Sequence, residues 1–378
     1  MESRTAVSRE KILHALYEAA ELEQNLMCTY LYAAFSLKDG ASEGLGPAEA
    51  EAVARWRRAI LDVAIDEMSH LVAVWNITAA LGGAPQFGRT NFPLDPGYLP
   101  ASIAVKLAPF SAATIQHFIF LERPETSGEP DGDGFVPADA PTRTPVAPRL
   151  TPASYDYATI GIFYRTIEAD LRALAAAIGE EALFCGDPAL QMSETEVGLA
   201  GARPVTDLAS ALAALTEIVE EGEGAPAHRD GSHFQRFVAV QAELRAFVAA
   251  DPGFAPAHPV AVNPVLRKPP RAEGRVWLDD PDAVATVDLA NAIYALALRL
   301  LAGAYAVPRP RPDKALYSGA AIGLMHALTA VAERAARLPA GPSNPGCNAG
   351  ISFTALRDAA SLPPGASARQ LYVERAEE

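Results

Sequence analysis

The sequence predicts an all-α protein built on a four-helix bundle, and three observations carry this prediction. Long segments repeat apolar residues alternately three and four positions apart, which is the spacing of one helix face. Pro and Gly stand at the ends of those segments, where they start and stop helices. Carboxylates interrupt two neighbouring stripes, as expected for a bundle that holds polar ligands in its core.

The first predicted helix begins near Ser8, which can serve as its N-cap, and ends before Asp39-Gly40. One of its faces carries Ile12, Leu16, Ala19, Glu23, Leu26, Tyr30, Ala33 and Leu37. Glu23 is therefore predicted to point into the core. Tyr30 lies two turns further along the same face, where its hydroxyl could bond a ligand or lie near a metal.

The second predicted helix runs from about Pro47 to Leu81 and is closed by Gly82-Gly83. Its inner face carries Val53, Trp56, Ile60, Val63, Glu67, His70, Val74, Ile77 and Leu81. A buried carboxylate protonates, finds a partner or binds a cation, and one metal ion would satisfy both Glu67 and His70. The alternative is a core histidine bonded to Glu67 or to a backbone carbonyl. Because Glu23 interrupts the neighbouring helix as well, the metal is favoured.

Composition limits the function. The 378 residues are 50% hydrophobic and 20% charged, with a net charge of −15, so we expect a globular protein without a nucleic-acid or anionic-membrane partner. The N-terminus has no apolar signal core, and the longest apolar segment, 287–307, is broken by polar residues, which argues against export and membrane spanning. The three cysteines, Cys28, Cys185 and Cys347, are far apart, so we expect free thiols and a cytoplasmic location.

The middle of the chain is predicted to hold irregular crossovers around two helices. Residues 84–109 form an irregular crossover, a short helix spans 112–121, and residues 125–153 form a long exposed loop. His117, in the short helix, is interpreted as a surface or packing histidine. The next helix covers about 155–178. Its stripe has no polar interruption, and its members are Tyr157, Ile160, Tyr164, Ile167, Leu171, Leu174 and Ile178.

Four further acids lie on or near the later helices. Glu168 lies beside the stripe of the 155–178 helix and could reach the site or form a solvated flank. After a connector at 180–204, a helix starting near 205–207 runs into Glu220, Glu221 and Glu223. Carboxylates at a helix C-terminus are unfavourable unless a positive charge compensates them, so a bound cation would explain Glu220 and Glu223; an ordinary acidic helix end is the alternative. We interpret Glu221 as solvated.

A further helix begins at Ser232, and His233 is the only non-apolar residue of its stripe. Residues 251–280 are Pro-rich and predict an ordered strap. Two helices at about 282–304 and 313–338 should pack outside the bundle, followed by an irregular surface tail. We therefore expect one unit, with a core bundle at about 8–250 and a C-terminal helical extension at about 251–378.

Six segments carry a family resemblance. They are Leu22-Glu23 through Tyr32 and Ser36; Asp66-Glu67-Met68-Ser69-His70-Leu71 with Asn76 and Gly82-Gly83-Ala84-Pro85; 160–164; 218–224; 232–237; and 348–353. In this order they resemble the ferritin-like family that includes the iminophenyl-pyruvate dimer synthases of violacein and indolocarbazole biosynthesis. The resemblance spans nearly the whole chain, although those synthases are much longer. It implies a ferritin-like four-helix bundle with a metal site and, in characterised relatives, oxidative coupling of two amino-acid-derived imines.

Two positions depart from the family pattern. An acidic residue often stands where this chain has Ile162, and a Gln where it has Glu221. If the family ligand comes from the former position, this chain lacks it or uses Glu168 instead.

Together, stripes and resemblance predict a ferritin-like bundle with long irregular crossovers and additional C-terminal helices. The predicted metal ligands are Glu23, Glu67, His70, Glu168, Glu220, Glu223 and His233. Tyr30 and Tyr164 are the predicted catalytic residues, as donors of a hydrogen bond or a proton. Iron, favoured as a di-iron centre, is the expected cofactor, with manganese or zinc as alternatives.

The function expected from this site is oxidation, with dioxygen, of a small amino-acid-derived imine, keto acid or aromatic substrate. An iron-binding or storage protein and a metal-free structural relative are the two alternatives. Homo-oligomerisation stays open.

Overall fold

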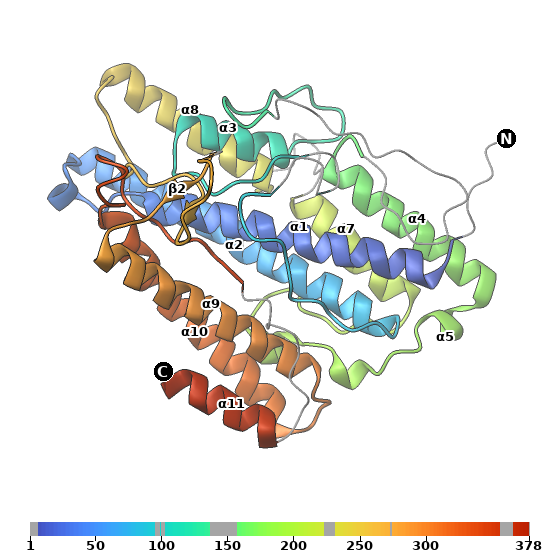
Figure 1. Ribbon diagram of the computed structural model, residues 1–378. Coiled ribbons are helices and arrows are strands. Elements are labelled where there is room, and N and C mark those ends of the chain that lie inside the picture. The colour runs from blue at the N-terminus through green and yellow to red at the C-terminus, as the bar shows by residue number, and fades with distance from the viewer. Residues whose placement is uncertain are drawn as a thin grey trace.

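The computed structural model describes residues 7–94, 99, 103–136, 157–222, 231–272, 274–355 and 366–377. Helices dominate these ranges (Figure 1), and the strands β1 (Pro264–Val265) and β2 (Val276–Trp277) form one short parallel pair. The predicted all-α fold is confirmed. All three cysteines are free thiols, as expected.

The centre of the molecule is an antiparallel hairpin of two long helices, α1 (Arg9–Ser36) and α2 (Pro47–Ala80), joined through the short 3₁₀ helix η1 (Ala41–Glu43). The Ser8 side chain caps α1 by accepting a hydrogen bond from the Lys11 backbone N–H. Glu49 caps α2 by accepting from the Gly46 N–H at 2.7 Å. These boundaries agree with those predicted from the sequence.

The other two helix positions of the four-helix bundle are each filled by two shorter helices (Figure 1). One consists of α3 (Ala112–Leu121) and α4 (Ile160–Ile178), and the other of α7 (Leu208–Glu221) and α8 (His233–Ala250). The helix α3 packs with α8, while α4 packs with α7, so the two pairs cover different parts of the central hairpin. The inner ends of the split helices therefore meet over its middle.

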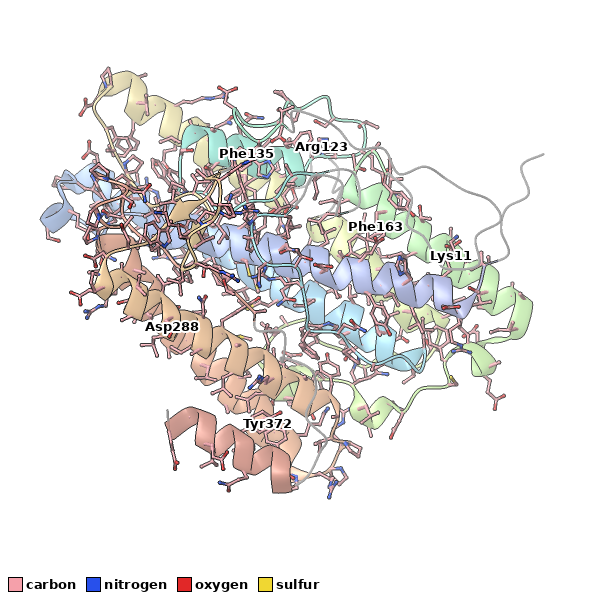
Figure 2. The ribbon with its side chains drawn as sticks, viewed as in Figure 1. Lys11, Arg123, Phe135, Phe163, Asp288 and Tyr372 are labelled. Atoms are coloured by element: carbon pink, nitrogen blue, oxygen red, sulfur yellow. The ribbon has the colours of Figure 1, made fainter. Side chains whose placement is uncertain are left out.

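The helix α4 starts at Ile160 rather than near residue 155, because the Thr159 side chain caps it by accepting from the Ile162 N–H. Residues 155 and 156 lie outside the described ranges. Arg123, which follows α3, joins the two helices of this position: its guanidinium donates to the Ala158 carbonyl at 2.8 Å. Figure 2 labels Arg123 and Phe163 on either side of this junction.

Part of the predicted exposed loop packs onto α3. His117 is buried, and its Nδ1 lies 2.6 Å from Oδ1 of Asp131. Gly132 approaches so closely that a Cβ there would lie 2.1 Å from the Ala113 carbonyl oxygen. Residues 125–136 are therefore a packed cover, while 137–153 fall outside the described residues.

The connector 180–204 contains three short elements: α5 (Glu180–Leu183), η3 (Pro188–Leu190) and α6 (Glu194–Val197). The buried side chain of Asn76 fastens it to α2. Its Nδ2 donates to the Met192 and Arg203 carbonyls, and its Oδ1 accepts from the Met192 N–H at 2.9 Å.

The C-terminal helices α9 (Pro281–Tyr305) and α10 (Pro312–Arg337) form a second hairpin beside the bundle, and α11 (Ala366–Glu377) packs against α9 (Figure 1). Gln24 ties α9 to α1 by donating to the Tyr294 hydroxyl at 2.7 Å. The prediction of a purely irregular surface tail is wrong. Ile351 and Phe353 are buried, and α11 is a helix.

By length and composition, α9 and α10 could each cross a membrane. Of the most apolar 18-residue window, 50% is buried in α9 and 28% in α10. Core helices of soluble proteins pass the same test, and the hydrogen bond from Gln24 to Tyr294 shows α9 packed against the bundle.

Candidate metal centre

The two central helices bring a first group of ligands together: Glu23 from α1, with Glu67 and His70 from α2. All three side chains are buried. Nδ1 of His70 lies 3.2 Å from Oε2 of Glu67 and 3.7 Å from Oε2 of Glu23. Because the residues lie on the facing stripes of adjacent helices, the apolar spacing of each helix fixes where they point.

A second group shares Glu67 with the first and adds Glu122 and His233, both buried. Nδ1 of His233 lies 3.1 Å from Oε1 of Glu67 and 3.4 Å from Oε2 of Glu122. Glu67 therefore turns one carboxylate oxygen towards each histidine. The two imidazole rings are 5.6 Å apart between centroids.

Glu122 is the residue that sequence reasoning missed. It directly follows the ten residues of α3, and the prediction treated it only as part of the helix end before Pro124. A signal was present, since Ile115, Phe118 and Glu122 are spaced three and four apart and share a face. The split of the bundle turns that helix end into the middle of the site.

Each outer carboxylate is held by a buried tyrosine. The Tyr164 hydroxyl donates to Oε1 of Glu23, and the Tyr30 hydroxyl donates to Oε1 of Glu122. In both pairs the second carboxylate oxygen, Oε2, faces the histidines. The two tyrosines predicted to be catalytic thus contact the candidate ligands symmetrically.

Four atoms of this cluster are buried without a hydrogen-bond partner: Oε2 of Glu23, Oε1 of Glu67, Oε2 of Glu122 and Nδ1 of His233. Buried polar atoms without partners are costly, and native proteins rarely keep several in one place. Carboxylate oxygens and imidazole nitrogens are also the donors that first-row divalent metals accept. The cluster therefore fits a metal centre.

One further carboxylate lies beside the outer nitrogen of each histidine. Oδ2 of Asp66 lies 3.3 Å from Nε2 of His233 and 2.8 Å from the Arg236 guanidinium. Oε2 of Glu221 lies 3.4 Å from Nε2 of His70. The interpretation of Glu221 as merely solvated is therefore wrong, although 43% of its side chain is exposed.

The buried charges shift one another's pKa values. Burial, and next the charge of Glu67, raise the pKa of Glu23 to about 8. Burial alone would raise the pKa of Glu67, but the adjacent His233 and His70 outweigh it and lower that pKa. Burial would likewise lower the pKa values of the two histidines, yet the surrounding carboxylates raise both. The carboxylates therefore make this cluster favourable for positive charge.

Two predicted ligands, Glu168 and Glu220, do not join these groups. Glu168 lies on the flank of α4, where it pairs with Arg172 at 2.7 Å, because one position off the stripe turns a side chain by about 100°. Glu220 is exposed on α7. Glu223 lies outside the described residues. Ile162, where the family pattern often has an acid, is half-buried.

The backbone of Gly222, at the end of α7, borders the second group. A Cβ at this residue would lie 2.6 Å from Nδ1 of His233 and 3.1 Å from Oε2 of Glu122. A side chain there would fill the space into which those two donor atoms point.

Known proteins resemble this chain in sequence and fold. The sequence profile of the ferritin-like family matches residues 16–242, which contain both ligand groups. The crystal structure of a ferritin like protein from Caulobacter vibrioides aligns with a TM-score of 0.51 and 19% identity, covering 84% of this chain and 94% of that one.

Two curated proteins are similar in sequence. The chain is 29% identical to the 2-imino-3-(indol-3-yl)propanoate dimerase of Chromobacterium violaceum over 85% of its own length, and 27% identical to the dichlorochromopyrrolate synthase of Lentzea aerocolonigenes over 97%. It covers only 31% and 38% of those longer proteins.

Proposed function

The chain belongs to the ferritin-like family, and on that premise we propose that it is an iron-dependent oxidoreductase acting with dioxygen on a small amino-acid-derived imine or keto acid. The observation that carries this proposal is the sharing of Glu67 by two buried ligand groups. A carboxylate that offers one oxygen to each group suits a centre of two metal ions.

The residues of the chain have separable roles in this proposal. Glu23 and His70 would hold one ion, Glu122 and His233 the other, and Glu67 would contribute to both. A pair of iron ions would supply the redox chemistry with dioxygen. Tyr30 and Tyr164 fix the outer carboxylates and carry hydroxyl protons at the edge of the centre.

The similar curated proteins suggest the substrate class. The name of the first describes a dimerase of an indole-bearing imino acid. If this chain couples two such molecules, each loses one hydrogen atom as a carbon–carbon bond forms between them. The two electrons and two protons released would reduce one dioxygen to hydrogen peroxide.

Iron binding without a substrate is the competing function. Two features support the enzyme over it: the buried tyrosine beside each outer carboxylate, and the packed cover formed by residues 125–136 next to α3. Specific chemistry needs such fixed donors and irregular walls, whereas simple iron uptake does not.

The test is anaerobic reconstitution with ferrous iron, followed by oxygen-electrode measurements with and without aromatic imino and keto acids. We expect about two iron ions per chain and faster dioxygen consumption with substrate. Glu67→Ala should abolish both, whereas the matched control Glu168→Ala, which breaks only the pair with Arg172, should preserve them. Iron oxidation without any substrate effect would assign the protein to iron binding, and an absence of bound metal would overturn the proposal.

A further inference from the structure

Gly222 lies against the half of the candidate centre that His233 and Glu122 form. Its φ of −124° lies outside the left-handed region that favours glycine. What requires glycine is space, since a Cβ would lie 2.6 Å from Nδ1 and 3.0 Å from Cε1 of His233, and 3.1 Å from Oε2 of Glu122. Neither side chain can move away easily, because Asp66 holds the histidine and Tyr30 holds the glutamate.

A Cβ at residue 222 would fill the space in which His233 and Glu122 could bind an ion. Nδ1 of His233 and Oε2 of Glu122 are 3.4 Å apart, and neither has a hydrogen-bond partner. An ion bound by both at about 2.1 Å would lie within about 3.5 Å of that Cβ, wherever it stood around the line between the two donors. On the side of that line that faces residue 222, the methyl group would displace the ion.

The crowding is confined to one half of the centre. The three atoms nearest to the Cβ of residue 222 belong to His233 and Glu122, and none belongs to Glu23 or His70. A larger residue at this position would therefore obstruct the Glu67, Glu122 and His233 group first.

We infer that Gly222 determines how many metal ions the centre holds. Glycine leaves room for the second ion at Glu67, Glu122 and His233, and alanine restricts the protein to one ion at Glu23, Glu67 and His70. This inference rests on the proposed metal-binding function and adds the residue that sets the number of ions.

The test titrates the metal-free full-length protein with cobalt(II) under anaerobic conditions and counts bound ions from the cobalt absorption bands. We expect two ions in the wild type and one in Gly222→Ala. The matched control is Gly319→Ala on α10, where a Cβ would meet nothing within 4 Å, and it should bind two. In the Gly222→Ala background, Glu122→Gln should change nothing further, whereas His70→Ala should remove the remaining ion.

A glycine needed only for tight packing would give a different result. Gly222→Ala would then melt at a lower temperature but still bind two ions, which would overturn the inference while leaving the proposed function intact. A wild-type protein that binds no cobalt would instead overturn the proposed function.

A second variant covers the case in which Gly222→Ala does not fold. His233→Ala removes the atom closest to the added methyl, so it should tolerate alanine at 222. Free imidazole should restore the second ion in His233→Ala, but not in the double variant His233→Ala with Gly222→Ala. Equal rescue in both proteins would contradict the inference.

Discussion

Asp66 holds His233 from outside the cluster: its Oδ2 lies 3.3 Å from Nε2 of the ring, while Nδ1 on the other edge faces Glu67 and Glu122. Glu221 stands in the same relation to His70, at 3.4 Å from Nε2. Each histidine is thus held between an outer carboxylate and the buried centre. Outer partners of this kind fix the orientation of a ligating imidazole and raise its basicity.

The first prediction concerns Asp66. Asp66→Ala should lower the affinity for the ion held by His233 by about 10- to 100-fold, because the ring loses the partner that orients it. The other ion should be affected much less. Cobalt(II) titration measures both affinities, and Asp62→Ala, an exposed acid one turn earlier on α2, is the control. Equal weakening of both ions would show that Asp66 acts on the whole bundle instead.

The second prediction concerns Glu221, which lies beside His70 as Asp66 lies beside His233. Glu221→Gln should keep the affinity of the His70 ion nearly unchanged, because an amide oxygen can still accept a hydrogen bond from Nε2. Glu221→Ala should weaken it by about tenfold or more. The same titration separates the two variants, with Glu220→Ala as the control on the exposed side of α7. If glutamine proved as damaging as alanine, the negative charge would matter rather than the hydrogen bond.

The two tyrosines should matter for oxidation more than for metal binding. Tyr164→Phe removes the hydroxyl that donates to Glu23, which costs the metal-free protein about 1–3 kcal/mol in unfolding free energy. It should retain two ions, while its dioxygen consumption with substrate falls. Urea unfolding and the oxygen electrode measure the two effects. Tyr17→Phe, half-buried on another face of α1, is the control, and unchanged oxygen consumption in Tyr164→Phe would assign the phenol a structural role only.

The stripes located the ligands that long helices carry. Glu23, Glu67 and His70 interrupt apolar runs many turns long, so their direction is fixed by helical spacing alone. His233 was found in the same way, at the first residue of α8. Glu122 was not, because α3 has fewer than three full turns and the carboxylate follows its last residue.

The split of the bundle could not be read from local sequence. Nothing within α3 or α4 states that they share one position in the bundle, since the contacts of Arg123 with Ala158 and of α3 with α8 join residues far apart in the chain. Glu168 shows the opposite error. A shift of one position along a helix separates a core residue from a surface residue, and the apolar spacing did not decide which of the two Glu168 is. Glu168 forms an ion pair with Arg172 on the flank of α4.

Lys314 predicts a pH dependence of stability unrelated to the centre. Its ammonium is buried, donates to the Leu190 and Ala304 carbonyls, and has a pKa lowered by burial to about 8. Between about pH 8 and 10.5 the unfolded chain therefore binds more protons than the folded one, so stability rises with pH. From pH 7.5 to 9.5, urea unfolding should show a gain of about 1–2 kcal/mol relative to Lys314→Met. Parallel pH profiles of the two proteins would contradict this.

The last prediction follows from the position of Glu67 in both ligand groups. Because one oxygen faces each histidine, Glu67→Ala should remove both ions, whereas Glu23→Ala and Glu122→Ala should each remove one. All three variants should stay helical, because alanine favours helices and each variant deletes a buried carboxylate. Metal analysis after reconstitution with iron counts the ions, and circular dichroism checks the fold. If the double variant Glu23→Ala with Glu122→Ala still bound one ion, that ion would lie outside both groups. A Glu67→Ala protein that kept one ion would show two independent sites rather than one bridged centre.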